Sequence, residues 1–140
     1  MSGGNYLFAL ELSVRDYECD LQGVVNNAVY LNYLEHTRHE YLKTLGLDFA
    51  RLHQQGCDLV LTRCELDYKA PLRSGDRLVV RLNLERESRL RFAFLQEIYR
   101  LPDEHLVLQA KAIGTGRIQG RPALPPELQA LLEGGAKPSA

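Results

Sequence analysis

The sequence predicts an α+β domain in which one long helix packs against an antiparallel sheet. Residues 6–14 place apolar side chains at every second position, which is the pattern of a half-buried strand. Apolar residues between positions 27 and 45 recur at helical spacing instead, so this segment is predicted to be an amphipathic helix. Several strand-length segments with short connections follow, and such connections favour antiparallel pairing between consecutive strands.

The remaining elements are predicted in order along the chain. A short helix is expected over residues 48–55, because Gly56 ends its apolar pattern. The strands that follow are separated by turn-forming Pro, Gly and Asp residues and are expected at 59–68, 77–85, 90–99 and 105–118. A last short helix opens at Pro125 and Pro126. This order predicts an antiparallel sheet of about five strands with one face buried against the long helix.

Composition limits the classes of function that the chain can have. Its 140 residues are 45% hydrophobic and 25% charged, which predicts a single domain over residues 1–140 with flexible ends at 1–5 and 134–140. A formal net charge of −1 provides no positive field for a nucleic-acid partner. No apolar run is long enough for a membrane span, and three cysteines without a CxxC motif indicate neither disulfides nor a zinc site. We therefore expect a cytoplasmic location.

Residues 16–27 contain the candidate site. Three acids and one thiol precede the predicted helix N-terminus, where unpaired backbone N–H groups and the helix dipole favour negative charge. Such a helix end can stabilise the oxyanion of an acyl-transfer intermediate, and a nearby carboxylate can attack an acyl group or activate water. The same residues can also act only as caps, with Asn26 or Asn27 capping the helix. The residues alone leave both interpretations open.

A family resemblance is carried by the run DLQGVVNN at residues 20–27 and by EHTR at residues 35–38. Together these motifs resemble the opening of the 4-hydroxybenzoyl-CoA thioesterase family, which adopts the hot-dog fold. The chain looks closest to the plant acyl-lipid thioesterases and their bacterial relatives, and the resemblance covers most of residues 6–132. It implies a hot-dog fold, an antiparallel sheet wrapped around one long helix.

The resemblance assigns roles to four residues of this loop. It implies that Asp20 is the catalytic acid, acting as nucleophile on the thioester carbonyl or as general base for water. Asn27 matches the residue whose backbone N–H points at the thioester oxygen. Gly23 matches the residue that lets the loop turn close to the substrate, and Asn26 matches an asparagine that lines the site. Val24 departs from the family pattern, because many relatives have His at this position.

The resemblance also implies where the substrate binds. The acyl chain is expected in an apolar channel beside the long helix, with Tyr30 and Leu34 among its lining residues. Arg89 and Arg91 lie at a strand turn that is near the phosphates of the carrier in hot-dog thioesterases, so they are candidates for phosphate recognition.

Other reactive side chains have simpler interpretations. Cys19 lacks a nearby base in the sequence and is expected to be a small buried filler. His36 and Glu40 are one helical turn apart, but they do not form an HExxH motif and have no third ligand, so a solvated helix face is expected and no metal. Glu35 and Arg38 could pair with each other or across a subunit boundary, and Glu35 is the alternative catalytic acid to Asp20.

The predicted function is hydrolysis of fatty acyl or 3-ketoacyl thioesters of acyl carrier protein or coenzyme A to free acid and thiol. Neither a metal nor an organic cofactor is needed for this chemistry. A homodimer or homotetramer is expected, because family members pair their sheets edge to edge and pairing removes an exposed strand edge. Two alternatives are a non-catalytic protein that binds acyl thioesters and a hot-dog hydratase or dehydratase, although the His expected for the latter is missing at Val24.

Overall fold

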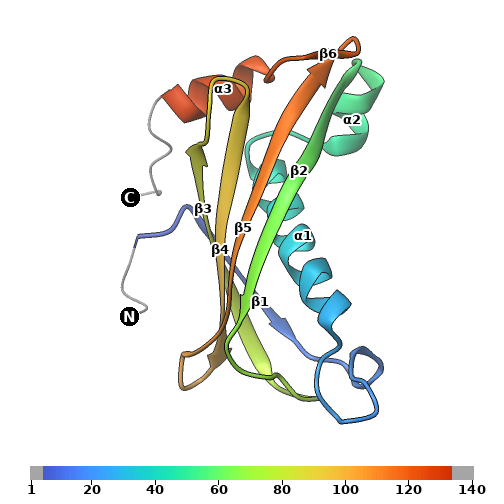
Figure 1. Ribbon diagram of the computed structural model, residues 1–140, viewed down its shortest axis with the longest axis vertical. Helices are drawn as coiled ribbons and strands as arrows, with labels where there is room; N and C mark the ends of the chain where they lie inside the picture. Colours follow the sequence, from blue (N-terminus) through green and yellow to red (C-terminus); the bar gives the residue numbers. More distant parts are fainter. Residues whose placement is uncertain (1–4, 134–140) are drawn as a thin grey trace.

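The computed structural model describes residues 5–133 and has the predicted arrangement of one long helix against a curved sheet (Figure 1). The elements are β1 (Phe8–Ser13), a 3₁₀ turn η1 (Asp16–Glu18), α1 (Asn27–Thr44), α2 (Phe49–Gln54), β2 (Cys57–Tyr68), β3 (Arg77–Arg86), β4 (Arg91–Leu101), β5 (His105–Ile118), β6 (Arg121–Pro122) and α3 (Pro126–Glu133). The predicted order of helices and strands is confirmed. The turn η1 and the two-residue β6 were not predicted, because elements this short have no periodicity. Apart from residue 5, the two ends that we expect to be flexible lie outside the described residues.

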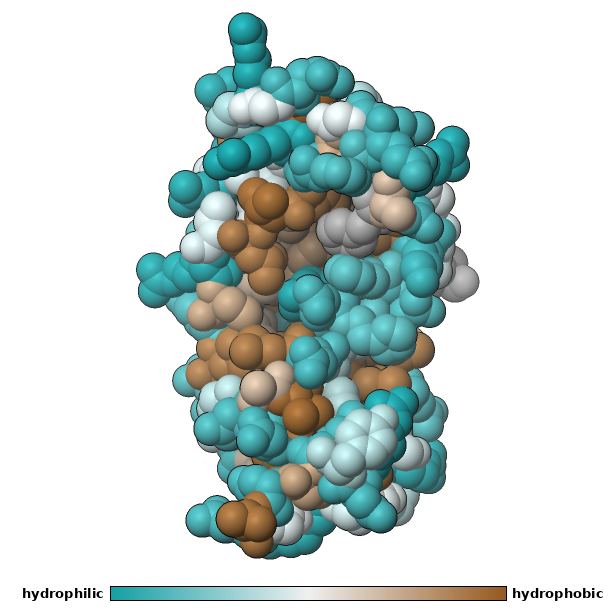
Figure 2. All heavy atoms as spheres, turned by 90° about the vertical axis from the view of Figure 1, so that its right-hand side faces the viewer, coloured by the Kyte–Doolittle hydropathy of each residue, from teal (hydrophilic) through white to brown (hydrophobic). Residues whose placement is uncertain are grey.

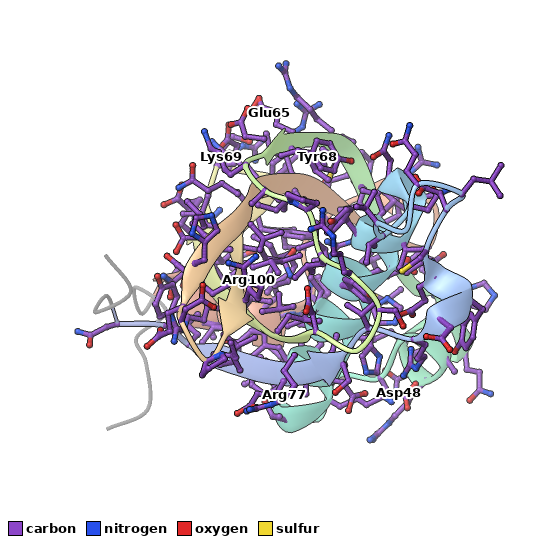
Figure 3. The ribbon with its side chains drawn as sticks, turned by 90° about the horizontal axis from the view of Figure 1, so that it is seen from below. Asp48, Glu65, Tyr68, Lys69, Arg77 and Arg100 are labelled. Atoms are coloured by element: carbon purple, nitrogen blue, oxygen red, sulfur yellow. The ribbon has the colours of Figure 1, made fainter. Side chains whose placement is uncertain are left out.

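All neighbouring strands of the sheet are antiparallel. Their order is β1-β3-β4-β5-β2, with β6 paired to β5, so β1 and β2 are the two edges. Seen from below, the sheet curls from β2 through β5, β4 and β3 to β1, and α1 packs against its concave face (Figure 3). The end of β2 at Tyr68, the start of β3 at Arg77 and the end of β4 near Arg100 lie at this lower end.

The sequence of α1 explains both where the helix begins and which face it buries. Asn26 is the N-cap, and its side-chain oxygen accepts a hydrogen bond from the Ala28 N–H at 2.9 Å. After the helix, Gly46 adopts a positive φ of 78° that suits glycine at this position. The buried residues recur every three or four positions and form the stripe Tyr30, Tyr33, Leu34, Thr37, Arg38, Tyr41 and Leu42.

A polar layer divides the hydrophobic core into two clusters. One cluster lies against the N-terminal half of α1, and the other lies against its C-terminal half together with α2 and α3. Between them, Thr37 donates a hydrogen bond to the Tyr33 carbonyl at 2.8 Å, and Arg38 Nη1 donates to Gln96 Oε1 on β4 at 2.9 Å. Gln96 Nε2 in turn donates to the Leu34 carbonyl at 3.0 Å. Polar residues can therefore occupy a helix face that is otherwise apolar, because their groups are paired inside the core.

Candidate active site

The loop between η1 and α1 forms a tight turn that presents Asp20. An isolated bridge joins Cys19 to Val25, so the loop closes on itself before the helix begins. Inside it, the Asp20 N–H donates to the Val24 carbonyl at 2.9 Å, and the Gly23 N–H donates to the Asp20 carbonyl at 3.0 Å. Gly23 has a φ of 79°, a left-handed conformation that a side chain would strain. The predicted turning role of Gly23 is consistent with this geometry.

The Asp20 side chain is exposed, and its own loop holds it in one orientation. Oδ1 accepts hydrogen bonds from the N–H groups of Gln22 at 2.8 Å and Val24 at 3.4 Å. Within residues 5–133, Oδ2 accepts no hydrogen bond. One oxygen therefore orients the carboxylate, while the other is available to react with an acyl group or to bind water.

The N-terminus of α1 provides a backbone donor beside this loop. Asn26 satisfies the Ala28 N–H with its side chain and the Val29 N–H with its carbonyl at 2.9 Å. In the part of the chain that the structure describes, the Asn27 N–H has no hydrogen-bond acceptor. A free N–H at the positive end of a helix dipole is the kind of group that stabilises an oxyanion.

A buried carboxylate connects the Asp20 loop to the helix. Glu18 accepts hydrogen bonds from the Arg15 N–H at 2.9 Å, from Arg15 Nη1 at 3.0 Å and from the Tyr33 hydroxyl on α1 at 2.7 Å. Its backbone carbonyl accepts from the Asn26 N–H at 2.9 Å. Glu18 therefore holds both the base of the loop and the N-cap of α1, and so sets the position of Asp20 relative to the Asn27 N–H.

These contacts shift the ionisation of both partners. Burial raises the pKa of Glu18, but hydrogen bonds from the Arg15 backbone, Tyr33 and the Arg15 side chain outweigh it, and the pKa falls below its ordinary value. Burial and the hydrogen bond to Glu18 raise the pKa of Tyr33. Glu18 is therefore an ionised structural carboxylate and Tyr33 is a neutral donor at neutral pH.

We expect Glu18→Gln to lower the free energy of unfolding at pH 7 by about 1–3 kcal/mol. Glutamine has one acceptor oxygen where glutamate has two, and its NH₂ group would face a donor of Arg15. Since the pKa of Glu18 is depressed by folding, its stabilisation is present above the unfolded-state pKa of about 4.3 and is lost as pH falls through the folded-state value. The difference from wild type should therefore shrink towards pH 3. Urea unfolding at both pH values measures it, with the exposed Glu85→Gln as control. An equal loss at both pH values would contradict this account.

The structure brings together four of the predicted site residues, keeps Tyr30 close to them in the first turn of α1, and places the other three further away. Asp20, Gly23, Asn26 and Asn27 lie on one loop and the helix end that follows it. The remaining predictions are Tyr30, Leu34, Arg89 and Arg91.

Tyr30 and Leu34 are buried in the core and do not line the cavity that lies beside the helix. Leu34 is 0% exposed, and Tyr30 accepts a hydrogen bond from the Leu72 N–H at 3.1 Å, which anchors the connection between β2 and β3. Both residues pack in the core cluster that lies against the N-terminal half of α1. Cys19, which we predicted as a buried filler, is only half-buried but packs against the same cluster.

Arg89 and Arg91 lie at the opposite end of the subunit from Asp20. The Asp20 loop is bridged through Val24 to Arg73, just before β3 begins. Arg89 lies in the turn after β3 and Arg91 begins β4, so the ten residues of β3 separate them from the loop by about 30 Å. A role in phosphate recognition beside Asp20 therefore needs a second subunit.

A cavity of about 340 Å³ lies between α1 and β2, further along the helix than Asp20. Its polar lining residues are Glu35, Arg38 and His39. Its apolar lining residues are Leu42, Leu59, Val60, Leu61, Phe92 and Phe94. Glu35 and Arg38 do not form an ion pair within the described residues, since Arg38 hydrogen-bonds Gln96 instead. Among residues 5–133, no group of three or more His, Cys, Asp or Glu side chains is arranged to hold a metal ion.

The curled sheet, the enclosed helix and the acidic loop at the helix N-terminus define a hot-dog domain of the thioesterase type. A family model described as the thioesterase-like superfamily matches residues 14–132. The chain belongs to this superfamily, which confirms the predicted fold and family.

Individual relatives agree with this assignment. The chain is 42% identical over 104 residues to acyl-acyl carrier protein thioesterase ATL3, chloroplastic, of Arabidopsis thaliana, a match that covers 74% of this chain and 55% of that protein. Among solved structures, it is similar to Slr0204 from Synechocystis, a 1,4-dihydroxy-2-naphthoyl-CoA thioesterase, with a TM-score of 0.84, 25% identity and coverage of 92% and 96% of the two chains. A hypothetical protein, AQ1494, from Aquifex aeolicus has a TM-score of 0.82 and 30% identity, with coverage of 89% and 98%.

The match to the plant proteins is partial. The chain spans about 55% of the length of ATL3 and 54% of its relative ATL2. Across residues 5–133, no helix is long and apolar enough to cross a membrane.

Proposed function

We propose that the chain is a thioesterase that hydrolyses fatty acyl or 3-ketoacyl thioesters of acyl carrier protein or coenzyme A to free acid and thiol. Asp20 acts as nucleophile on the carbonyl carbon or as general base for water. The Asn27 N–H stabilises the oxyanion, with Gly23 and Asn26 shaping the loop around it. The reaction needs no metal or organic cofactor, and we propose a cytoplasmic location.

One observation carries this proposal: among residues 5–133, the Asp20 carboxylate has one oxygen that accepts no hydrogen bond, the Asn27 N–H has no acceptor, and the two groups flank the same short turn. Acyl transfer needs both groups, one to attack or activate water and the other to receive the charge that develops on the carbonyl oxygen. ATL3 is an acyl-acyl carrier protein thioesterase and Slr0204 is a 1,4-dihydroxy-2-naphthoyl-CoA thioesterase, so these two relatives support this reaction class and leave two carriers to compare.

The proposal is tested by measuring thiol release from dodecanoyl and 3-oxododecanoyl groups, each attached to coenzyme A and to acyl carrier protein. We expect turnover of at least one pair, with the higher kcat/KM identifying the carrier. 1,4-Dihydroxy-2-naphthoyl-CoA, the substrate in the name of Slr0204, is measured alongside to compare an aromatic with a fatty acyl group. A folded protein that binds these thioesters and releases no thiol from any of them would contradict the proposal and favour the non-catalytic alternative.

We further propose that the active form is a homodimer, or a homotetramer built from such dimers, paired through β2. β2 is an edge strand, and its side chains from Val60 to Glu65 are exposed. Leu61 is 47% and Tyr68 50% exposed. Figure 2 shows apolar side chains gathered on the side of the molecule that carries this edge. A long edge strand that exposes apolar side chains is stabilised by pairing with a second copy.

We expect Leu61→Lys to shift the protein towards monomer, because a charge at this edge must be desolvated on pairing. Light scattering at micromolar concentration measures the molecular mass of wild type and variant. Leu45→Lys, at an exposed site just after α1, is the matched control and should keep the wild-type mass. A monomeric wild type would contradict the proposed assembly.

A further inference from the structure

The cavity between α1 and β2 is open on one side and closed on the other. Its lining residues on the edge strand β2 include Val60 and Leu61, which are 37% and 47% exposed. Its lining residues on the central strand β4 are Phe92 and Phe94, which are only 2% and 3% exposed. The cavity therefore leads from the exposed edge of the sheet into the hydrophobic core and ends at two aromatic rings.

The sequence of β5, which lies between β4 and β2, explains why these rings reach the cavity. Gly114 of β5 pairs with Phe92 on one side and with Leu61 on the other. A Cβ atom at Gly114 would lie only 2.7 Å from Cζ of Phe92, so the ring occupies the space that a side chain of β5 would need. The neighbouring pair is Phe94 with Ala112, another small residue. Small residues on β5 therefore allow the rings of β4 to extend towards β2.

Packing holds the two rings in place. Phe92 and Phe94 meet edge to face, with ring centroids 5.6 Å apart and an interplanar angle of 82°. Phe94 also meets Tyr41 of α1 edge to face, with centroids 6.5 Å apart. All three belong to the core cluster that includes Leu128 of α3. Because a close-packed core resists displacement of its side chains, the closed end of the cavity has a fixed position.

The position of the cavity along α1 indicates which part of a substrate it can hold. Glu35, the first cavity residue of the helix, is eight residues after Asn27, which is about 12 Å along the axis. Leu42, the last, is fifteen residues after Asn27, which is about 22 Å. An acyl chain whose thioester lies at the Asn27 N–H therefore reaches the cavity with its far end. The aliphatic and aromatic lining suits a hydrocarbon there.

We propose that the cavity binds the hydrocarbon end of the acyl chain and that Phe92 and Phe94 set the maximum chain length of the substrate. This inference rests on the proposed thioesterase function and assigns the two residues as specificity-determining. Each methylene group that enters the cavity raises kcat/KM by about fourfold, and a methylene beyond the rings has no space. A reacting loop supplied by a second subunit changes the preferred length but not the residues that limit it.

The experiment measures kcat/KM for thioesters from hexanoyl to octadecanoyl in two-carbon steps, on the carrier and in the acyl class, saturated or 3-oxo, that wild type hydrolyses faster. We expect kcat/KM to rise by about tenfold per step up to one length and to fall beyond it. Phe92→Ala removes a ring from the closed end and should move this optimum to chains longer by about two to four carbons. Leu59→Phe enlarges a lining side chain and should move it to shorter chains.

Phe8→Ala is the matched control, because Phe8 packs against Tyr41 in the same core cluster but lies outside the cavity lining. This variant should lose stability and keep the wild-type optimum. If Phe92→Ala does not fold, Phe92→Leu tests the same shift with a smaller change in volume. An unchanged optimum in the folded Phe92 variant, including a uniform loss of activity at every chain length, overturns the inference. Failure of wild type to hydrolyse any thioester of either acyl class overturns the proposed function itself.

Discussion

Replacing Asp20 with asparagine is expected to reduce kcat for acyl-thioester hydrolysis by about 1,000-fold or more. The amide can neither attack the carbonyl carbon nor take a proton from water. Removal of a group in either role typically lowers the rate by about two to four orders of magnitude. Asparagine keeps a side-chain oxygen that can accept from Gln22 and Val24, so the loop geometry should persist. Steady-state kinetics together with binding of a non-hydrolysable thioether analogue measure both effects, and we expect little change in binding.

Asp16→Asn is the matched control for this variant. Asp16 is an exposed acid four residues earlier in the same segment, and its side chain accepts a hydrogen bond from Ser74, an interaction that asparagine can keep. The control should retain kcat within a few-fold. Near-normal turnover by Asp20→Asn would move the catalytic role to another acid, with Glu35 as the first alternative.

Replacing Asn27 with proline is expected to reduce kcat by about 100- to 1,000-fold, because it removes the backbone N–H assigned to the oxyanion. Proline is well tolerated at the first helical position, where its fixed φ suits the helix and no intrahelical bond is lost. Asn26 already has φ −64° and ψ 142°, the extended conformation that a residue before proline prefers. The variant therefore changes one donor and leaves the fold of α1 intact, which circular dichroism can verify.

Asn27→Ala separates the backbone from the side chain at this position. Alanine removes the exposed amide but keeps the N–H, so its kcat should stay within a few-fold of the wild-type value. If alanine and proline reduce kcat equally, the side chain rather than the backbone N–H participates, and the proposed oxyanion site is wrong.

The turn and the helix cap that carry the candidate site could be predicted because their information is local in sequence, whereas the catalytic roles of their residues come from the family resemblance and stay predictions. Asp20, Gly23, Asn26 and Asn27 lie within eight residues, and the turn and cap that join them depend on hydrogen bonds between near neighbours. The helix face was predictable for the same reason, since its periodicity is a local property.

The residues that support the site could not be predicted, because their partners are distant in sequence. Glu18 meets Tyr33 fifteen residues later, and Arg38 meets Gln96 across 58 residues, a contact that requires the register of β4 against the helix. No single-sequence pattern specifies such a pairing. The interruption of the apolar face at Arg38 was visible, but the buried amide that accepts its hydrogen bond was not.

The substrate-binding predictions illustrate a second limit. Periodicity indicates that Tyr30 and Leu34 face inwards, but it does not distinguish a residue packed in the core from one that lines a cavity. Likewise, a turn was correctly expected near Arg89. Its position at the far end of β3 from Asp20 depends on the sheet topology, which the sequence pattern does not specify.

Mass spectrometry of the whole reaction mixture determines whether the Asp20 loop hydrolyses a thioester. Wild type and Asp20→Asn are each incubated with a saturated acyl thioester and with its enoyl counterpart. We expect wild type to release free acid and free thiol in equal amounts from the saturated substrate and the variant to release neither. An intact thioester that gains the mass of one water from the enoyl substrate would identify a hydratase, and unchanged substrates with a folded wild type would identify a binding protein. Either result would show that the Asp20 loop does not hydrolyse thioesters.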